Sequence, residues 1–287
     1  MMVLAVSRLS YTYPRSAVQA LHDLNFEIPE GQIIGFLGPN GAGKTTTQKI
    51  ITGILSGYEG EVRVFGKSLK ELGSDYYNRI GVSFEYPNLY NRLTAEENLN
   101  FYRRFFDVPT EEPAALLARF NLPIGDNRTV GQYSKGMKMR LTLLRSLLNN
   151  PQLWFLDEPT TGQDPEHSVM IRDIIREQRN KGTSIFLTTH NMTLADELCD
   201  RIAFIVDGRI ATFDTPRNLK IAHAKRVVRV EYREDGSVKA RDFSLEDAAS
   251  KEAFIDLVRK ATIETIHTME PSLENVFIEI TGRGLSI

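Results

Sequence analysis

The sequence predicts an α/β fold with a largely parallel sheet at its centre, a helical insertion and a small α+β piece at the C-terminal end. Three observations support this prediction. Short apolar runs alternate with helical patterns over residues 153–206, which is typical of β–α–β units. A glycine-rich loop at residues 38–45 stands between an apolar run and a helical stretch. Near Lys225 the pattern changes to a hairpin followed by helices.

The N-terminal half begins with strands. Residues 3–13 and 24–28 alternate polar and apolar side chains, as half-buried strands do, and residues 33–37 form an apolar run. Three further elements are expected: a helix at 45–55 and strands at 62–65 and 80–84. Residues 89–148 contain few β-branched residues and have helical spacing, which predicts a helical insertion.

Strands are expected to resume after this insertion. The central elements are strands at 153–156, 184–188 and 202–206 with helices at 169–180 and 193–199 between them. Strands joined by helical crossovers run parallel, so these should form one buried sheet. The C-terminal elements are a hairpin at 227–232 and 237–243, helices at 251–260 and 273–281, and a strand at 263–268. The predicted domains are residues 1–224, with a helical subdomain at about 88–148, and residues 225–287.

Composition excludes several classes of protein. The chain has 287 residues, of which 41% are hydrophobic and 25% charged, as in ordinary globular proteins. No apolar run approaches the roughly 18 residues that cross a bilayer, and the N-terminus has no pattern of a secretion signal. The single Cys199 allows no internal disulfide and fits a reducing compartment. A net charge of −2 argues against a general nucleic-acid binder.

Residues 38–45 match the pattern G-x-x-x-x-G-K-[ST] of a phosphate-binding loop. Because glycine has no Cβ, the backbone N–H groups of such a loop can approach a phosphate, and the next helix adds the positive end of its dipole. Lys44 is expected to reach the β- and γ-phosphates, and Thr45 to offer its hydroxyl to Mg²⁺. The residues expected to bind nucleotide here are Gly38, Pro39, Asn40, Gly41, Ala42, Gly43, Lys44, Thr45 and Thr46.

Polar side chains at the ends of two later strands complete this predicted site. Asp157 follows the strand at 153–156 and is expected to be a Mg²⁺ ligand. Glu158 is then placed to polarise the water that attacks the γ-phosphate, although an acidic pair before Pro159 could also be a helix cap. His190 follows the strand at 184–188, at the sheet edge where α/β proteins bind ligands, and could contact the γ-phosphate.

With these motifs the chain resembles the ATP-binding subunits of ABC transporters, in particular of export systems whose membrane part is a separate polypeptide. The likeness covers residues 3–225 and implies a P-loop NTPase motor domain with a mixed sheet and a helical subdomain. Tyr13 takes the place of the family's adenine-stacking aromatic residue, but could be an ordinary strand-edge tyrosine. Asp164 lies in a segment similar to the loop between two motor subunits, and His190 resembles the family's switch histidine.

Residues 133–137, here called the signature segment, read Tyr-Ser-Lys-Gly-Met and are similar to the family signature Leu-Ser-Gly-Gly-Gln. Ser134 and Gly136 match, and the resemblance implies that they bind a nucleotide held by a second subunit. Lys135 departs from the signature and would add a positive charge near that γ-phosphate. Glu85 replaces the family's glutamine, and we expect it to contact Mg²⁺ directly or through water, unless it is a solvated loop acid.

The resemblance implies an ATPase that uses ATP and Mg²⁺ and forms a head-to-tail pair, most simply a homodimer. It would drive a transmembrane permease from the cytoplasmic face of the membrane and bind no nucleic acid. Residues 271–277 resemble the tails of drug, lantibiotic and sodium export motors, which favours export. The alternative is a soluble ABC-type ATPase acting on ribosomes or DNA. Such proteins usually have two fused motors, a coiled-coil insertion or a basic arm, and this chain shows none of these.

Overall fold

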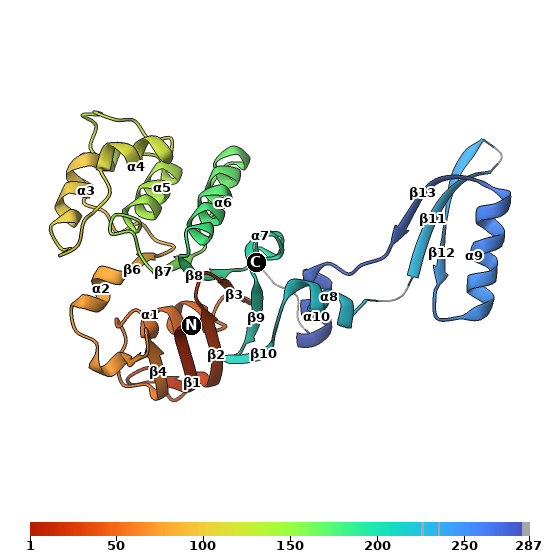
Figure 1. The fold of residues 1–287 in the computed structure, drawn as a ribbon, viewed down its shortest axis with the longest axis horizontal. Coiled ribbons are helices and arrows are strands. Elements are labelled where there is room, and N and C mark those ends of the chain that lie inside the picture. The colour runs from red at the N-terminus through yellow and green to blue at the C-terminus, as the bar shows by residue number, and fades with distance from the viewer. Residues whose placement is uncertain (225–226, 235, 283–287) are drawn as a thin grey trace. The chain divides into compact units, whose positions relative to one another are not determined.

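The computed structural model describes residues 1–224, 227–234 and 236–282 (Figure 1). Its internal contacts divide it into two units, Met1–Thr215 and a second unit that begins at Pro216. Each unit is described by itself. The division precedes the boundary expected at residue 224, because helix α8 (Pro216–Ala222) packs against helix α10 (Leu273–Thr281), which belongs to the second unit.

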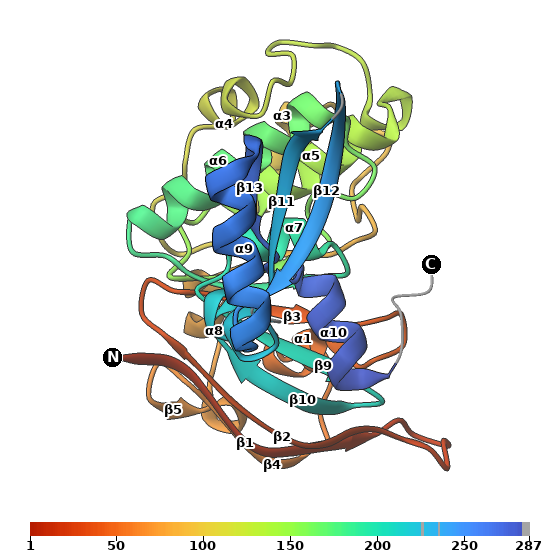
Figure 2. The same ribbon diagram turned by 90° about the vertical axis from the view of Figure 1, so that its right-hand side faces the viewer.

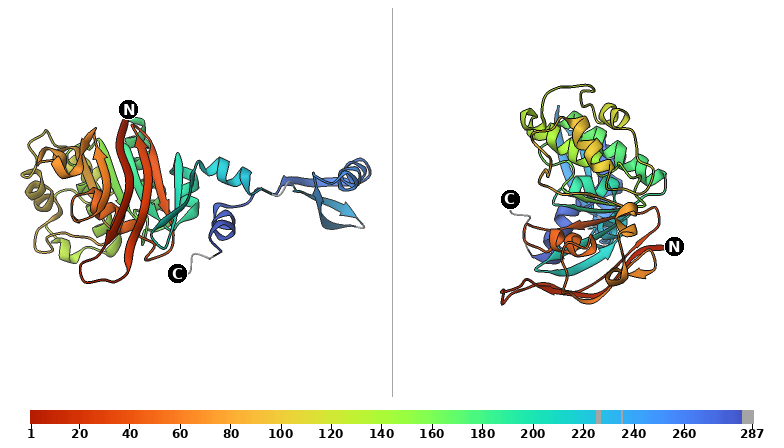
Figure 3. Two further views of the ribbon diagram at one scale, coloured as in Figure 1. Left: turned by 90° about the horizontal axis from the view of Figure 1, so that it is seen from below. Right: turned by 90° about the vertical axis from the view of Figure 1, so that its left-hand side faces the viewer.

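The first unit contains an antiparallel sheet in the order β2-β1-β4-β5. Its strands are β1 (Met2–Thr12), β2 (Gln19–Pro29), β4 (Glu59–Val64) and β5 (Lys67–Ser68). Figure 3 shows β1 and β2 side by side as long strands. The buried ring of Phe26 on β2 lies 4.7 Å from that of Phe36 and 6.0 Å from that of Phe186, so this sheet shares its core with the central sheet.

The central sheet of the first unit has the order β10-β9-β3-β8-β7-β6. Its strands are β3 (Ile33–Leu37), β6 (Ile80–Ser83), β7 (Leu153–Asp157), β8 (Ser184–Thr189), β9 (Arg201–Val206) and β10 (Arg209–Asp214). All neighbours run parallel except β10, which is antiparallel to β9, so the predicted mixed sheet is confirmed. Every residue of β3, β7 and β8 is buried, which explains their continuous apolar runs.

Seven α-helices of the first unit are α1 (Lys44–Ile51), α2 (Asp75–Arg79), α3 (Ala95–Arg103), α4 (Pro113–Arg119), α5 (Lys135–Arg145), α6 (Pro165–Asn180) and α7 (Met192–Leu198). Residues 84–152, all of which are described, contain helices and no strand. In Figures 1 and 2, α3, α4 and α5 group together away from β1, β2 and β4. The predicted helical insertion is therefore present.

Three of the α-helices and strands of the first unit were not predicted. These are α2, the two-residue strand β5 and strand β10, whose side chains are mostly half-buried or exposed and show no regular period. The helix expected at 45–55 ends at Ile51, because Gly53 adopts a positive φ of 78° that terminates it. Strand β2 begins at Gln19, five residues before the expected start at Leu24, because irregular pairing with β1 extends it.

The second unit contains a sheet in the order β12-β11-β13 with helix α9 packed on it. Its elements are β11 (Val227–Glu234), β12 (Ser237–Ser244), α9 (Ala248–Lys260) and β13 (Thr262–Thr268). Val228, Val230 and Phe243 are buried beneath Phe254 and Leu257 of the helix. The predicted hairpin is confirmed on both sides of Asp235, which lies outside the described residues. Of the described helices in either unit, none is long and apolar enough to cross a membrane.

Candidate nucleotide-binding site

The glycine-rich loop between β3 and α1 requires glycine at two of its positions, Gly38 and Gly43. A Cβ on Gly38 would lie 2.1 Å from the backbone oxygen of Ile205, so no side chain fits there. Gly43 has a φ of 108° and stands at the start of α1, where the chain turns into the helix. The first N–H groups of α1 have no partner within the helix, so together with the loop they can bind an anion.

Lys44, the first residue of α1, is held against this loop. Its side chain is 7% exposed, and its Nζ donates hydrogen bonds to the backbone oxygens of Gly38 at 2.6 Å and Pro39 at 3.1 Å. Burial lowers the pKa of Lys44, while the charges of the carboxylates at Glu158 and Asp157 oppose this shift. When protonated, the Lys44 ammonium group can donate charge-assisted hydrogen bonds to the oxygens of a triphosphate.

Asp157 ends strand β7 and is fixed by two hydroxyl groups. The Thr45 hydroxyl donates to Oδ2 at 3.2 Å, and Thr188, directly opposite on β8, donates to Oδ1. Burial raises the pKa of Asp157, and these two hydrogen bonds oppose that shift. The loop and the end of β7 are thus joined through a single carboxylate.

Glu158 follows with a positive φ of 50°, which is uncommon for a residue other than glycine. Its backbone N–H donates to Thr188 at 2.9 Å, which stabilises this turn. One carboxylate oxygen accepts hydrogen bonds from Thr189 at 3.0 Å and Thr161 at 3.4 Å. The other lies 2.7 Å from Nδ1 of His190, whose side chain is 51% exposed. Left-handed residues held in this way cluster at functional sites.

These groups surround one cavity of about 110 Å³. It is lined by Asn40, Gly41, Ala42, Gly43, Lys44, Thr45, Thr46, Glu85, Asp157 and Glu158. Hard oxygen donors from Thr45, Asp157 and Glu85 suit Mg²⁺. Among the described residues, however, no group of three or more His, Cys, Asp and Glu side chains could hold a metal alone.

Seven expected site residues do not line this cavity: Gly38 and Pro39 of the loop, His190, and the four residues Tyr13, Ser134, Gly136 and Asp164. The Tyr13 hydroxyl is 2.9 Å from that of Thr46, which places the tyrosine beside the helical end of the loop. Ser134 caps α5 by accepting a hydrogen bond from the N–H of Met137 at 3.2 Å, and Gly136 follows it in the same turn. Asp164 caps α6 in the same way through His167. None of these four residues lines the chain's own cavity.

The sequence did not single out the threonines that hold the two acids. Thr188 and Thr189 end strand β8, and Thr161 follows Glu158 in the next turn. Thr188 and Thr189 could have been identified from the sequence, because they are hydroxyl residues at the carboxyl end of a predicted central strand.

Comparisons with known proteins give the family. A profile described as ABC transporter matches residues 21–161, and one described as a fluoroquinolone efflux ABC transporter C-terminal domain matches residues 226–270. A fluoroquinolones export ATP-binding protein of Mycobacterium tuberculosis is 49% identical over 99% of this chain and 95% of that protein. Nod factor export ATP-binding protein I of Rhizobium etli is 31% identical over 97% of this chain and 93% of that protein.

Solved structures agree with these relatives. An ATP-binding subunit of an ABC transporter superposes with a TM-score of 0.70 at 30% identity, covering 77% of this chain and 92% of that one. A dimeric bacterial ABC transporter cassette superposes with a TM-score of 0.67 at 25% identity, covering 74% and 98%. The chain therefore belongs to the ABC transporter family, as an ATP-binding subunit with ATPase activity of the kind found in export systems.

Proposed function

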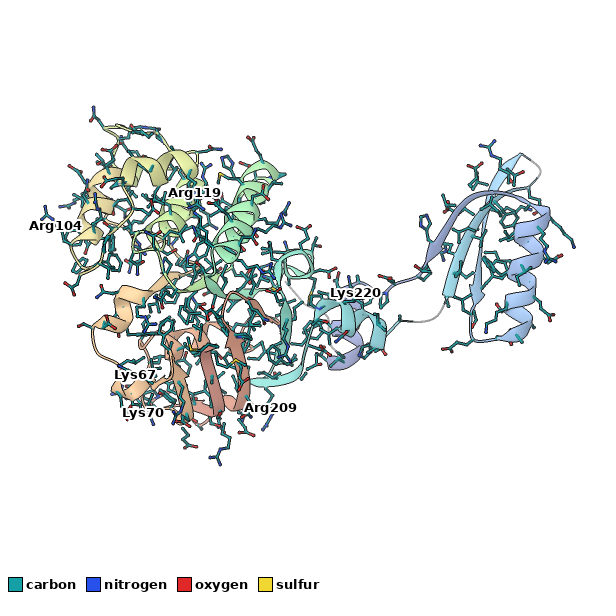
Figure 4. The ribbon with its side chains drawn as sticks, in the orientation of Figure 1. Lys67, Lys70, Arg104, Arg119, Arg209 and Lys220 are labelled. Carbon is teal, nitrogen blue, oxygen red and sulfur yellow. The ribbon has the colours of Figure 1, made fainter. Side chains whose placement is uncertain are left out.

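We propose that this chain works as a homodimer that hydrolyses Mg²⁺-ATP at the cytoplasmic face of a membrane and drives a separate transmembrane permease. We further propose that the cargo is a drug of the fluoroquinolone class. The 49% identity to a fluoroquinolones export ATP-binding protein supports this cargo, because it extends through both units of the chain. No feature in the described residues favours the alternative, a ribosome- or DNA-directed ATPase. The basic side chains labelled in the first unit, Lys67, Lys70, Arg104, Arg119 and Arg209, extend from different elements (Figure 4).

The observation that supports hydrolysis most directly is the pairing of Glu158 with His190 beside the loop that holds Lys44. When ATP is bound, its γ-phosphoryl group is the electrophile and water the nucleophile. We assign Glu158 to polarise that water, His190 to hold the carboxylate of Glu158, and Lys44 to bind the β- and γ-phosphates. Thr45, Asp157 and Glu85 would hold Mg²⁺, and Tyr13 would stack on adenine.

A second copy of the chain would supply the remaining contacts. Ser134 and Gly136 stand at the start of α5, where unpaired N–H groups favour an anion, yet they do not line the cavity of their own chain. A head-to-tail pair would bring them to the partner's nucleotide. Because one chain carries both halves of this proposed arrangement, a homodimer is sufficient.

The proposed permease contact is an aromatic surface just after Glu85. Tyr86 is 78% and Phe105 64% exposed, and Tyr90 and Phe101 are exposed as well. The Phe101 ring lies 4.8 Å from that of Tyr90 and 5.2 Å from that of Phe105, so three of these rings form a contiguous cluster. Exposed apolar clusters of this kind mark protein contacts. Such a contact would connect the permease with the acid that lines the nucleotide cavity.

Replacement of Glu158 tests this function. Glu158→Gln should lower ATP turnover by about 10²–10⁴-fold, since an amide cannot accept the proton of the attacking water. Nucleotide should still bind, and an ATP-bound dimer should accumulate, measured by size-exclusion chromatography of the purified protein with Mg²⁺-ATP. Glu27→Gln, at an exposed position of β2, is the matched control and should hydrolyse ATP normally. Normal turnover by Glu158→Gln would remove this residue from the proposed role.

A further inference from the structure

A second cavity of the first unit lies at the amino ends of the central strands, opposite the nucleotide site. Its volume is about 530 Å³, within the ~300–1,000 Å³ that is typical of small-molecule sites. Pro151 and Gln152, directly before β7, and Thr183, directly before β8, line it. Asp157 and Thr188 lie at the other ends of the same two strands. The length of these strands therefore separates the two cavities.

The guanidinium of Arg79 is held in one orientation on the wall of this cavity. Its Nε and Nη2 atoms donate to the side-chain oxygen of Gln152 at 3.1 and 2.7 Å. Both residues directly precede strands that pair in register, β6 and β7, which places them side by side. The guanidinium carbon also lies 3.6 Å from the centre of the Phe65 ring. A side chain fixed by stacking and hydrogen bonds loses little conformational entropy when it binds a ligand.

The same arrangement leaves one edge of the Arg79 guanidinium available. Gln152 occupies the edge formed by Nε and Nη2, so the parallel N–H groups of Nη1 and Nη2 on the outer edge can bind both oxygens of a carboxylate. In the part of the chain that the structure describes, no carboxylate pairs with Arg79. The other cation on this wall, Lys181, pairs with Glu177 at 2.8 Å. Glu30, the one acid on the wall, is 60% exposed. Arg79 is therefore the group that would bind an anion.

Apolar side chains form another part of the wall, and these are Met2, Val3, Phe65 and Pro151. Methionine adapts its shape to what it contacts. Phe65 and Gly66 form the two-residue turn between β4 and β5, and Phe65 has a positive φ of 52°. Asn, Asp or Gly is preferred in such a turn, and bulky residues in this conformation often lie at binding sites. A ligand that fits this cavity therefore needs an apolar body beside its anionic group.

We propose that this cavity binds a small molecule that carries one carboxylate group on an apolar body. The carboxylate accepts two parallel hydrogen bonds from Nη1 and Nη2 of Arg79, and the apolar body covers Met2, Val3 and Pro151. Because the two cavities lie at opposite ends of β7 and β8, this ligand and nucleotide should bind to one chain at the same time. The site requires neither the homodimer nor the cargo of the proposed function.

Naphthoate and its neutral amide, naphthamide, test this chemistry because they share one apolar body. The carboxylate preference is the dissociation constant of naphthamide divided by that of naphthoate, both measured by isothermal titration calorimetry on the full chain. We expect a preference of about tenfold or more in the unaltered protein, because bidentate hydrogen bonds between arginine and carboxylate are among the strongest. Inorganic phosphate, which lacks the apolar body, should bind more weakly than naphthoate.

Variants show which side chain binds the carboxylate. Arg79→Met removes the guanidinium and should bring the preference close to one. Arg79→Lys keeps the charge but not the planar pair of donors, and should lower the preference at least about threefold. Gln152→Glu places a carboxylate against the same guanidinium and should lower the preference with Arg79 still present. Arg209→Lys, at an exposed position of β10, is the control and should leave the preference unchanged (Figure 4).

The affinity for naphthamide shows whether a variant retains the cavity. A variant that keeps its naphthamide affinity and loses its preference for naphthoate has lost only the carboxylate contact, as the proposal requires. If Arg79→Met binds neither probe, the Gln152→Glu variant decides, because it keeps the guanidinium and its stacking on Phe65. An unchanged preference in Gln152→Glu would then overturn the proposal.

Three further results would overturn this inference. The first is equal affinity of the two probes for the unaltered protein, or no binding of either at millimolar concentrations. The second is a preference that survives both Arg79→Met and Gln152→Glu. The third is displacement of naphthoate by Mg²⁺-ADP, which would put the probe in the nucleotide cavity. None of these results bears on the role of Glu158, so this inference and the proposed function can fail separately.

Discussion

At the scale of single residues, the side chains that line the nucleotide cavity carry more negative than positive charge. Lys44 is the one cation among the residues that line the cavity, whereas Glu85, Asp157 and Glu158 bring three carboxylates. Both Asp157 and Lys44 are buried, and this burial raises the pKa of Asp157 and lowers that of Lys44. An excess of negative charge in this position is suited to a divalent cation.

Glu85 gives a prediction at this scale. Glu85→Ala should raise the Mg²⁺ concentration needed for half-maximal ATP turnover several-fold, because it removes the carboxylate that we propose as a Mg²⁺ ligand together with Asp157. Glu85→Gln retains one ligand oxygen and should have a smaller effect. The measurement is a Mg²⁺ titration of turnover at fixed ATP, with Glu71→Ala at an exposed position as the control. A titration curve for Glu85→Ala that matches the unaltered protein would leave this acid as a loop residue without a metal role.

At the scale of elements, side-chain hydrogen bonds define where helices α3 and α5 begin. Helix α3 begins with a capping box, in which the Thr94 hydroxyl accepts from the N–H of Glu97 at 3.2 Å and the Glu97 carboxylate accepts from the N–H of Thr94 at 2.8 Å. Helix α5 begins in a similar way at Ser134. The cap of α3 is at the start of the helix that carries Phe101, one of the exposed aromatic residues.

Loss of this cap should be measurable. Thr94→Ala should lower the free energy of unfolding by about 1 kcal/mol, since it removes the hydroxyl that accepts the hydrogen bond from the N–H of Glu97. Thr94→Ser keeps the hydroxyl and should cost much less. Urea unfolding followed by circular dichroism gives both values. Equal stability of the two variants would mean that the cap does not stabilise α3.

Elements differed in how well the sequence predicted them. Strands β3, β7 and β8 are buried on both faces, so their composition alone indicates them, and the loop before α1 has a motif with fixed spacing. Strand β10 has mixed exposure and depends on pairing with β9. The contact of Thr188 with Asp157 spans 31 residues and follows from strand register, which local patterns do not contain. The hydrogen bonds from Arg79 to Gln152 were missed for the same reason.

At the scale of the whole molecule, the relatives match both units. The profile of the motor covers residues 21–161 and that of the C-terminal domain residues 226–270. We therefore expect transport of the proposed cargo to require both units of the chain together with the proposed permease.

Cells that express this chain with its permease should therefore accumulate less fluoroquinolone than cells with Lys44→Ala in the same pair. The reason is that removal of the phosphate-binding ammonium should abolish ATP turnover while the permease remains present. Fluorescence of the intracellular drug measures accumulation, and equal expression of the two proteins is the control. Equal accumulation, with ATP turnover intact in the purified complex, would reject this cargo and retain the motor.

The contact between α8 and α10 affects which changes of sequence length the C-terminal unit of an export ATPase can tolerate. Helices from the two ends of the second unit lie together, so the chain leaves this pair, builds the three-stranded sheet with α9, and returns to it. The segment between α8 and α10 begins and ends at the same helix pair. It can therefore be lengthened, exchanged or deleted while the two helices stay in contact. We therefore expect that residues 226–270 can be exchanged between related exporters without loss of the α8–α10 contact.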